Sequence, residues 1–261
     1  MKSWPDSDVA AILGVQLHRL PSLGNVRAAC EEFLDAGGTH CVFTPNPEIL
    51  LYARKHLDYA ALLNEADLAL PDGIGIVLVD FLRGHRRHGA LRKWAGIDVA
   101  DLILRLAARR SARVMFLGGR DGTADRAAAR WRAEIAGLDV VTVADDVPFG
   151  DDGAPVHSQD EAALDERIRE SEPAVIFVAI GHPKQERWIA NHRGAIPSAR
   201  ILMGVGGALD MWGGRFSRAP GWLRSMGLEW LWRLVQEPTR LPRVLRATIE
   251  FPFRALTERS G

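Results

Sequence analysis

Polar residues follow two apolar segments of the chain, and one of them is suited to proton transfer. In LALPDGIGI, Asp72 comes directly after an apolar run. A carboxylate there can accept a proton from a hydroxyl group, as a general base does, and capping of a turn or helix is the structural alternative. In TPNPEIL, Thr44 and Asn46 follow a second run. For these two residues the alternative is helix capping, with Pro47 at the first helical position.

Glycine turns follow three more apolar runs and suggest an anion or nucleotide site. Gly118 and Gly119 stand between an apolar run and a helical pattern, where backbone amides at the helix start can face a ligand. Gly181 and Gly206 end two later apolar runs. The turns match neither GxGxxG nor a Walker loop, so they do not specify the nucleotide.

Two polar residues lie just beyond these turns. Gln185 follows Gly181, and Asp210 is placed to meet a ribose hydroxyl or a base edge. The alternative is a glycine turn that leads into an exposed, charged helix start. Metal and nucleophilic chemistry have little support, because the chain has no GxSxG, no HExxH and no His/Cys pair at ligand spacing. Its one Asp-x-Asp is Asp6–Asp8, near the N-terminus.

Short β-branched runs alternate with helical patterns, which predicts an α/β domain with a mostly parallel sheet. Several of the runs are apolar throughout, as in strands that are covered on both faces. Asp98 and Asp160 are expected to cap the two helices that follow them. We expect strands at 40–44, 67–70, 113–117, 140–143, 174–180 and 201–205, and helices at 47–63, 98–110, 123–136, 160–171 and 184–193.

The composition excludes several classes of protein. The 261 residues have a formal net charge of zero, so bulk electrostatics predict no nucleic-acid partner, although basic residues crowd at 83–93 and in the tail. Cys30 and Cys41 lack metal-ligand spacing and are expected to be reduced, as in a cytosolic protein. No apolar stretch is long enough to span a bilayer and the start lacks a signal peptide, so we expect any membrane contact to be peripheral.

The strand–helix alternation stops near residue 212, which predicts a core at 1–211 and a helical appendage at 212–261. The pattern predicts one helix over 222–236 with a wide apolar arc, and Glu229 and Arg233 are spaced for an ion pair. Trp and Arg favour the membrane interface, so we expect this appendage to dock on lipid as well as on the core. Burial by core packing or self-association is the alternative.

Four ordered motifs, TPNPEIL, PDGIG, GHPKQE and GVGGALD, closely resemble the WecG/TagA/CpsF glycosyltransferases, glycosyltransferase family 26. The tail, RAP through GLEWLWRL to EP and RL, resembles the C-terminal signature of that family. The resemblance covers roughly residues 12–246. It implies a Rossmann-like sheet flanked by helices with a C-terminal helical appendage, a GT-E-like arrangement.

The resemblance also implies an activity. It is the inverting, metal-independent transfer of a sugar from a UDP-sugar to a polyprenyl-diphosphate-linked saccharide. The reaction serves cell-surface polymer or exopolysaccharide synthesis at the cytoplasmic face of the plasma membrane. No cofactor is needed beyond the UDP-sugar donor, and homo-oligomers are possible.

Carried onto this sequence, the resemblance makes Asp72 the base and places Thr44, Asn46 and Gln185 in the substrate pocket. It places Gly206 and Asp210 at the nucleotide, and the glycine turns described above add Gly118, Gly119 and Gly181 as candidate nucleotide residues. Four arginines of the tail are expected to reach the diphosphates: Arg218, Arg233, Arg240 and Arg243.

One stretch departs from the family pattern. In RKWAGID, Lys93 holds the place where the family usually has an arginine, and Arg92 precedes it. A lysine is a point charge rather than a bidentate fork, so which of the two contacts the diphosphate stays open. Two other functions are considered: a non-catalytic, membrane-associated nucleotide-binding module, and a dinucleotide oxidoreductase, which lacks its glycine fingerprint here.

Overall fold

Six short apolar segments form one parallel sheet in the computed structural model, which describes residues 8–84 and 90–257. The strand order is β4-β3-β8-β7-β5-β6. The predicted α/β fold with a parallel sheet is confirmed, and each predicted strand is present within one or two residues. The strands are β3 (His40–Phe43), β4 (Leu68–Ala69), β5 (Val114–Gly118), β6 (Val140–Val143), β7 (Val175–Ala179) and β8 (Ile201–Gly204).

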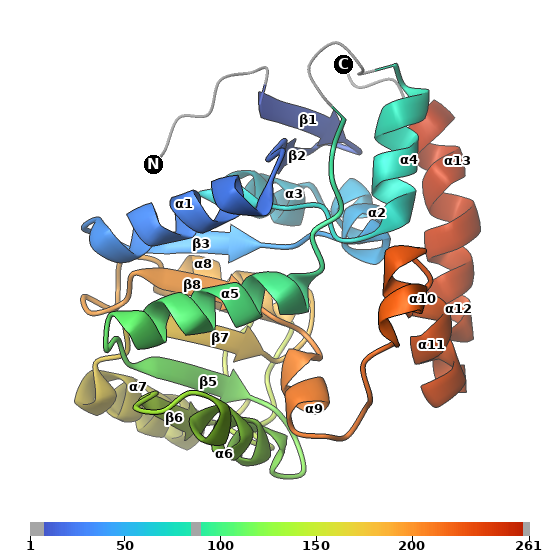
Figure 1. Cartoon of the computed structure of the whole chain (residues 1–261). Coiled ribbons are helices and arrows are strands. Elements are labelled where there is room, and N and C mark those ends of the chain that lie inside the picture. The colour runs from blue at the N-terminus through green and yellow to red at the C-terminus, as the bar shows by residue number, and fades with distance from the viewer. Residues whose placement is uncertain (1–7, 85–89, 258–261) are drawn as a thin grey trace.

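Helices cover both faces of the sheet (Figure 1). In β7, Val175 and Phe177 pack into one core cluster, and Ile176 and Val178 pack into the other. Alternate side chains of a strand point to opposite faces, so a sheet covered on both faces requires continuous apolar runs. The first core cluster contains α1 (Leu23–Asp35), α5 (Gly96–Arg109), α6 (Thr123–Glu134) and α9 (Ala208–Trp212); the second contains α2 (Pro47–Lys55), α3 (Leu57–Asn64), α7 (Ser158–Ser171) and α8 (Lys184–His192).

An antiparallel hairpin, β1 (Val9–Ile12) and β2 (Val15–His18), precedes the sheet and was not predicted. Its two-residue turn has φ of 50° at Leu13 and 81° at Gly14, as a type I′ turn requires. The Ala69 amide donates to Nδ1 of His18 at 2.7 Å, which ties the hairpin to β4. Burial lowers the pKa of His18 to about 4, so this imidazole is neutral at physiological pH.

Helix α4 (Ile74–Leu82) begins two residues after Asp72 and is fixed by a buried ion pair. Arg19 donates Nη1 to Oδ2 of Asp80 at 3.0 Å and Nη2 to Oδ1 at 2.8 Å. The Leu91 amide also donates to Asp80. The bidentate geometry and the further hydrogen bond from Leu91 offset part of the cost of burying these charges.

A chain of short helices follows residue 220 and lies at the sheet edge toward which the strands point (Figure 1). The last helix, α13 (Phe251–Thr257), packs on α4: Arg83 donates Nε to the Ala255 carbonyl at 2.7 Å, and Phe251 is fully buried close to Gly75. The C-terminal segments are α10 (Gly221–Ser225), α11 (Glu229–Gln236), η3 (Pro238–Arg240), α12 (Leu241–Leu245), η4 (Arg246–Glu250) and α13 (Phe251–Thr257). Over 8–84 and 90–257, no helix is both long and apolar enough to cross a bilayer.

Two predicted helices are broken. The helix predicted over 47–63 is interrupted at His56, an extended residue between α2 and α3. The helix predicted over 222–236 breaks before α11, where Gly227 has a φ of 74°. Positive φ ends a right-handed helix, so the predicted apolar arc is divided between two short helices.

Two predicted helix caps are wrong. Asp98 lies in the first turn of α5, which begins earlier at Gly96, where Asp72 accepts from the amide. Asp160 lies in the first turn of α7, because the His157 carbonyl already accepts from the amides of Asp160 and Glu161. The basic stretch 83–93 is described only at 83–84 and 90–93, and Asp6 lies outside the described residues.

Candidate active site

The carboxyl ends of neighbouring strands bring most of the predicted site residues to one edge of the sheet. Thr44 follows β3, Asp72 follows β4 and Gly206 follows β8, and these three strands are adjacent. Gly181 and Gly118 lie at the ends of β7 and β5, farther along the same edge. Ligands of open α/β sheets bind at this edge.

Asp72 is partly buried and its carboxylate meets the start of α5. Oδ2 accepts a hydrogen bond from the Gly96 amide at 3.1 Å, and the Asp72 amide donates to the Pro45 carbonyl at 2.8 Å. A Cβ on Gly96 would lie 2.6 Å from Thr44 Oγ1 and 3.7 Å from Asp72 Oδ2. Glycine at 96 therefore lets the Thr44 hydroxyl and the Asp72 carboxylate share one small space.

The surroundings raise the pKa of Asp72 to about 6. Burial is the largest cause, and Glu229 and Asp98 raise the pKa further. The Gly96 hydrogen bond and the charge of Lys93 act in the opposite direction. A carboxylate with a pKa near 6 is mostly ionised at neutral pH and still binds a proton readily, as a general base must.

A cluster of charges joins this strand end to the C-terminal helices. Glu229 of α11 lies 3.8 Å from Lys93 Nζ through Oε2 and 3.5 Å from Arg218 Nε through Oε1. Nη2 of Arg218 also lies 2.7 Å from Oδ1 of Asp98 on α5. The predicted pair between Glu229 and Arg233 is wrong, since Glu229 pairs with Lys93 and Arg218, and Arg233 pairs with Glu237.

Lys93 and Arg92 point to different surroundings. The Arg92 side chain is exposed and donates Nη1 to the Pro21 carbonyl, before α1. Lys93 lies in the charge cluster and lowers the pKa of Asp72. Of the two cations, the geometry places Lys93 beside the candidate base.

Asn46 caps α2. Its Oδ1 accepts from the amides of Glu48 at 2.9 Å and Ile49 at 3.0 Å, and Pro47 is the first helical residue. The alternative interpretation, helix capping, is therefore correct for the side-chain oxygen of Asn46. Thr44 instead directs its hydroxyl to the space beside Asp72.

Gln185 is buried and holds the turn after β8. Its Oε1 accepts from the Gly206 amide at 3.0 Å, and its Nε2 donates to Oε1 of Glu186 at 2.7 Å. A Cβ on Gly204 would lie 2.8 Å from Gln185 Nε2. The side-chain amide of Gln185 therefore packs against the end of β8 and fixes the path of the chain there.

Two arginines of the tail meet at the same turn. A Cβ on Gly207 would lie 2.5 Å from Nη2 of Arg233. Arg233 and Arg240 share Glu237, with Nε–Oε2 distances of 3.3 Å and 2.8 Å. Burial and then the nearby charge of Arg240 lower the pKa of Arg233, so a further anion at this turn would be stabilised.

The remaining predicted residues lie around this centre. Asp210 of α9 is 3.9 Å from Arg215 and interacts with Arg233 through its charge. Arg243 lies 3.5 Å from Glu48, which is also 3.6 Å from His182. Burial acts to raise the pKa of Glu48, but His182 and the two arginines at 243 and 240 hold it below its usual value.

Gly118 and Gly119 both have positive φ, 87° and 111°. A Cβ at Gly118 would lie 2.7 Å from Ile180 Cγ2, and one at Gly119 would lie 2.7 Å from Asp145 Oδ1. These positions require glycine to form the turn. Asp145, at the end of β6, was not predicted as a site residue.

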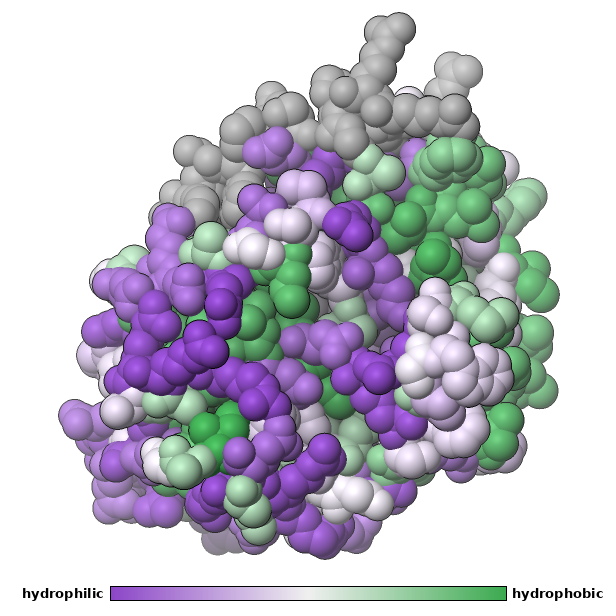
Figure 2. All heavy atoms as spheres, in the orientation of Figure 1, coloured by the Kyte–Doolittle hydropathy of each residue, from purple (hydrophilic) through white to green (hydrophobic). Residues whose placement is uncertain are grey.

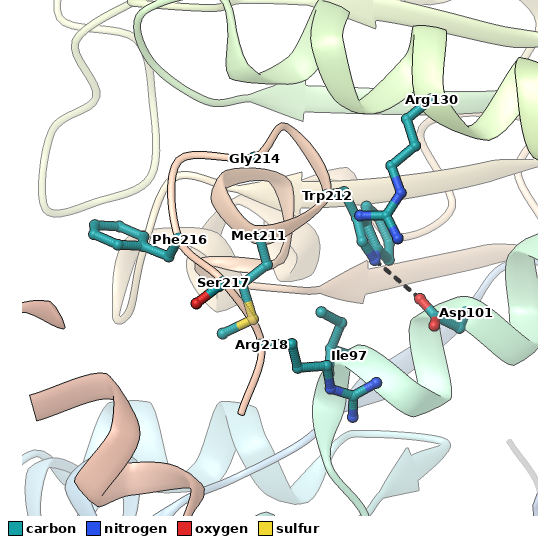
Figure 3. A pocket seen from close by; sticks show the side chains of 9 residues that line it. All are labelled: Ile97, Asp101, Arg130, Met211, Trp212, Gly214, Phe216, Ser217 and Arg218. Atoms are coloured by element: carbon teal, nitrogen blue, oxygen red, sulfur yellow. Dashed lines mark hydrogen bonds between the residues drawn. The ribbon is translucent and has the colours of Figure 1, made fainter. Parts of the chain in front are cut away.

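A pocket of about 370 Å³ adjoins the charge cluster through Arg218 (Figure 3). Asp101 accepts from Nε1 of Trp212 at 2.9 Å, and burial raises the pKa of Asp101 to about 6. Neither Asp72 nor the glycine turns line this pocket. Its lining residues are Ile97, Asp101, Arg130, Met211, Trp212, Gly214, Phe216, Ser217 and Arg218.

Sequence reasoning missed Glu229 as a site residue. It is part of the GLEWLWRL signature, but its spacing to Arg233 drew attention to a local pair. Its contacts with Lys93 and Arg218 are long-range and carry no spacing signal. Among the described parts of the chain, no three His, Cys, Asp or Glu side chains form a group that could hold a metal ion.

The chain is similar in sequence to known proteins. The family model of the glycosyl transferase WecG/TagA/CpsF family matches residues 10–261. An N-acetylglucosaminyldiphosphoundecaprenol N-acetyl-beta-D-mannosaminyltransferase of Bacillus subtilis is 31% identical over 83% of this chain and 77% of its own length. Proteins with the same name from Bacillus spizizenii and Staphylococcus aureus are 32% and 30% identical, over 82% and 78% of this chain and 77% and 74% of their own lengths.

Proposed function

The chain belongs to the WecG/TagA/CpsF family of glycosyltransferases, and we propose that it transfers a sugar from a UDP-sugar to a polyprenyl-diphosphate-linked saccharide. The observation that carries this proposal is Asp72, whose pKa is raised to about 6 beside Thr44 and Lys93 at the carboxyl edge of the sheet. A glycosyltransferase needs a base of this kind for its acceptor hydroxyl. Family membership sets aside the oxidoreductase and the non-catalytic module.

Asp72 takes the proton of the acceptor hydroxyl as the hydroxyl oxygen attacks the anomeric carbon. The bond from that carbon to the UDP oxygen breaks, and its electron pair leaves with UDP. Attack from the face opposite UDP inverts the anomeric centre. General-base assistance of this kind typically contributes about 10²–10⁴-fold.

The departing diphosphate gains negative charge, which must be stabilised. Arg233 and Arg240 share one carboxylate, that of Glu237, and burial and the charge of Arg240 lower the pKa of Arg233, so an added anion would be favoured there. Arg233 rests on Gly207, and the backbone turn after β8 is held by Gln185. We propose that these cations supply the stabilisation that a metal supplies in other transferases, in a metal-independent reaction.

We place the membrane against α4 and the last helices. Side chains spaced along one side of α4 are exposed: Ile74, Leu78, Phe81 and Leu82. A second stripe runs along α12 to α13: Leu245, Ile249, Phe253 and Leu256. All eight are 45–65% exposed, and Figure 2 shows apolar surface over this side of the molecule.

The two apolar stripes lie on helices that pack together, because Arg83 of the α4 end bonds to Ala255 of α13. Exposed arginines at 224, 243 and 246 accompany them, as expected for contact with anionic lipid. The sequence prediction rested on the apolar arc, the Trp and the Arg residues of the tail, and α4 was not part of it. A peripheral protein placed in this way holds Asp72, two residues before α4, close to a lipid-linked acceptor.

The substrates can be identified by a screen. The purified protein is incubated with UDP-glucose, UDP-mannose or UDP-N-acetylmannosamine and an extract of lipid-linked diphosphate acceptors, with and without EDTA. We expect UDP release that requires the acceptor, persists in EDTA and gives an inverted linkage by NMR. Release that EDTA abolishes would contradict metal independence, and a retained linkage would contradict direct displacement.

A further inference from the structure

A buried chain of hydrogen bonds runs from α3 to the turn after β8. The Tyr59 hydroxyl donates to Oε2 of Glu186 at 2.9 Å, and Nε2 of Gln185 donates to Oε1 of Glu186 at 2.7 Å. Oε1 of Gln185 then accepts from the Gly206 amide at 3.0 Å. Tyr59, Glu186 and Gln185 are 0%, 2% and 5% exposed.

The Glu186 carboxylate determines which way the Gln185 amide faces. Both oxygens of Glu186 accept hydrogen bonds, one from Tyr59 and one from Gln185, so the donor end of the Gln185 amide must face the carboxyl group. The carbonyl end is thereby directed to the Gly206 amide, which only donates. Without Glu186 the amide would be able to turn over, and it would lose this bond.

Holding a carboxylate in the interior is unfavourable, and burial raises the pKa of Glu186. The Tyr59 hydroxyl and the Gln185 amide each donate one hydrogen bond to it, which offsets part of that cost. An apolar residue at this place would leave the Tyr59 hydroxyl and the Gln185 amide without their acceptor. Packing alone therefore does not account for the carboxylate.

The far end of the chain is the turn on which Arg233 rests, next to Gly207. We propose that Glu186 is a positioning residue for the donor: it orients the Gln185 amide and so holds the turn that presents Arg233 to the diphosphate. This inference rests on the proposed function, in which that turn binds UDP. Tyr59 supports Glu186 from the opposite side.

Two measurements on the full chain test the inference. Hydrogen exchange reports protection of the Gly206 amide, and calorimetry reports UDP affinity. For Glu186→Ala we expect faster exchange at Gly206 and UDP binding weakened about 10-fold, with the acceptor KM within about twofold. Since both residues act through one bond, Gln185→Ala with Glu186→Ala should bind UDP no more weakly than Gln185→Ala alone.

Two control variants separate positioning from general loosening. Glu186→Gln can still accept from Gln185 and donate to Tyr59, so it should keep Gly206 protection and UDP affinity within about threefold of the original chain. Leu63→Ala opens a cavity one turn after Tyr59 on α3 and should lower Tm while leaving both readouts unchanged.

Unchanged exchange at Gly206 in Glu186→Ala would overturn the inference, as would additive losses of UDP affinity in the double variant. Equal losses of UDP affinity in Leu63→Ala and Glu186→Ala would also overturn it. If the original chain binds no UDP while Glu186→Ala still deprotects Gly206, the proposed function fails and the orientation of Gln185 by Glu186 stands.

Discussion

Lys93 Nζ lies 3.8 Å from Oε2 of Glu229, so a residue at the start of α11 reaches the cation beside Asp72. Glu229 also faces Arg218, and Glu229 and Lys93 shift the pKa of Asp72 in opposite directions. The C-terminal helices therefore act on the candidate base through charge. Their position sets how readily Asp72 takes a proton.

This coupling predicts the pH profile of the enzyme. The base must be ionised to act, so kcat/KM should rise with pH through an apparent pKa near 6. Lys93→Met removes a charge that lowers the pKa of Asp72, so the acidic limb should move to higher pH. A limb that stays in place would exclude Lys93 as a determinant of that pKa.

Glu229→Gln is the matched opposite change. It removes a carboxylate that raises the pKa of Asp72, and the acidic limb should move to lower pH. Because the two variants differ in direction, a general loss of structure cannot imitate both. If the acidic limbs of Lys93→Met and Glu229→Gln moved in the same direction, the electrostatic account would be contradicted.

The Asp101 carboxyl predicts a pH-dependent stability. Its pKa is raised to about 6 in the folded state, so the stabilisation from protonated Asp101 is present below about pH 4 and is lost as pH rises through 6. Asp101→Asn keeps an acceptor for Nε1 of Trp212. Because asparagine does not titrate, the variant lacks this loss of stability with rising pH. Between pH 5 and 7.5 the original chain should lose about 1–2 kcal/mol more unfolding free energy than the variant.

Urea denaturation at the two pH values measures this difference, with Asp139→Asn as the control. Asp139 is an exposed carboxylate that pairs with Arg113 at 2.7 Å and does not line the pocket. Its replacement should leave the pH dependence of stability unchanged. The same loss in Asp101→Asn as in the original chain would contradict the burial effect.

Arg233 is predicted to bind the donor rather than the acceptor. Loss of a charge-assisted contact to a diphosphate typically costs about 1.5–3 kcal/mol, so Arg233→Ala should weaken UDP binding by about 10–100-fold. Arg246→Ala removes an exposed arginine elsewhere in the tail and should bind UDP normally. Calorimetry compares the two, and equal affinities would remove Arg233 from the diphosphate site.

The membrane face predicts loss of lipid binding when charge enters either stripe. Leu78→Glu on α4 and Phe253→Glu on α13 should each reduce co-sedimentation with anionic liposomes by about 10-fold, because a carboxylate would have to leave water. Leu57→Glu, at a leucine that is 79% exposed on α3, is the matched control and should sediment normally.

A truncated chain that ends at 211 keeps the α4 stripe and lacks the stripe of α12 and α13. Its co-sedimentation with anionic liposomes therefore measures lipid binding without the tail. If the Leu78 and Phe253 variants sediment like the original chain, the lipid face is wrong. If the two variants instead convert a dimer to a monomer in analytical ultracentrifugation, a second copy covers this face.

The sheet was predictable because each strand is a short apolar run between turn residues. The runs that end at Phe43, Ala179 and Gly204 are covered on both faces of the sheet. Such strands need consecutive apolar residues, which can be recognised in the sequence. The hairpin was missed, since Leu13 has positive φ and leucine gives no turn signal. The break at Gly227 was missed because the apolar spacing continues through it.

The candidate site was predictable in parts. Residues next to strand ends, such as Asp72 and Gly206, share an edge whenever the strands are parallel and adjacent. The contact of Glu229 with Lys93 joins positions 136 residues apart and depends on how the tail folds back. The chain of bonds through Glu186 likewise needs Tyr59 from another helix.

The most direct test of the central claim is acceptor-dependent UDP release at pH 7.5 by the original chain and by Asp72→Asn. Asparagine still accepts from the Gly96 amide and removes the buried charge, so the variant should fold with an equal or higher Tm. The account predicts that kcat falls about 10²–10⁴-fold with donor KM nearly unchanged. A folded Asp72→Asn protein that turns over at the original rate would contradict it.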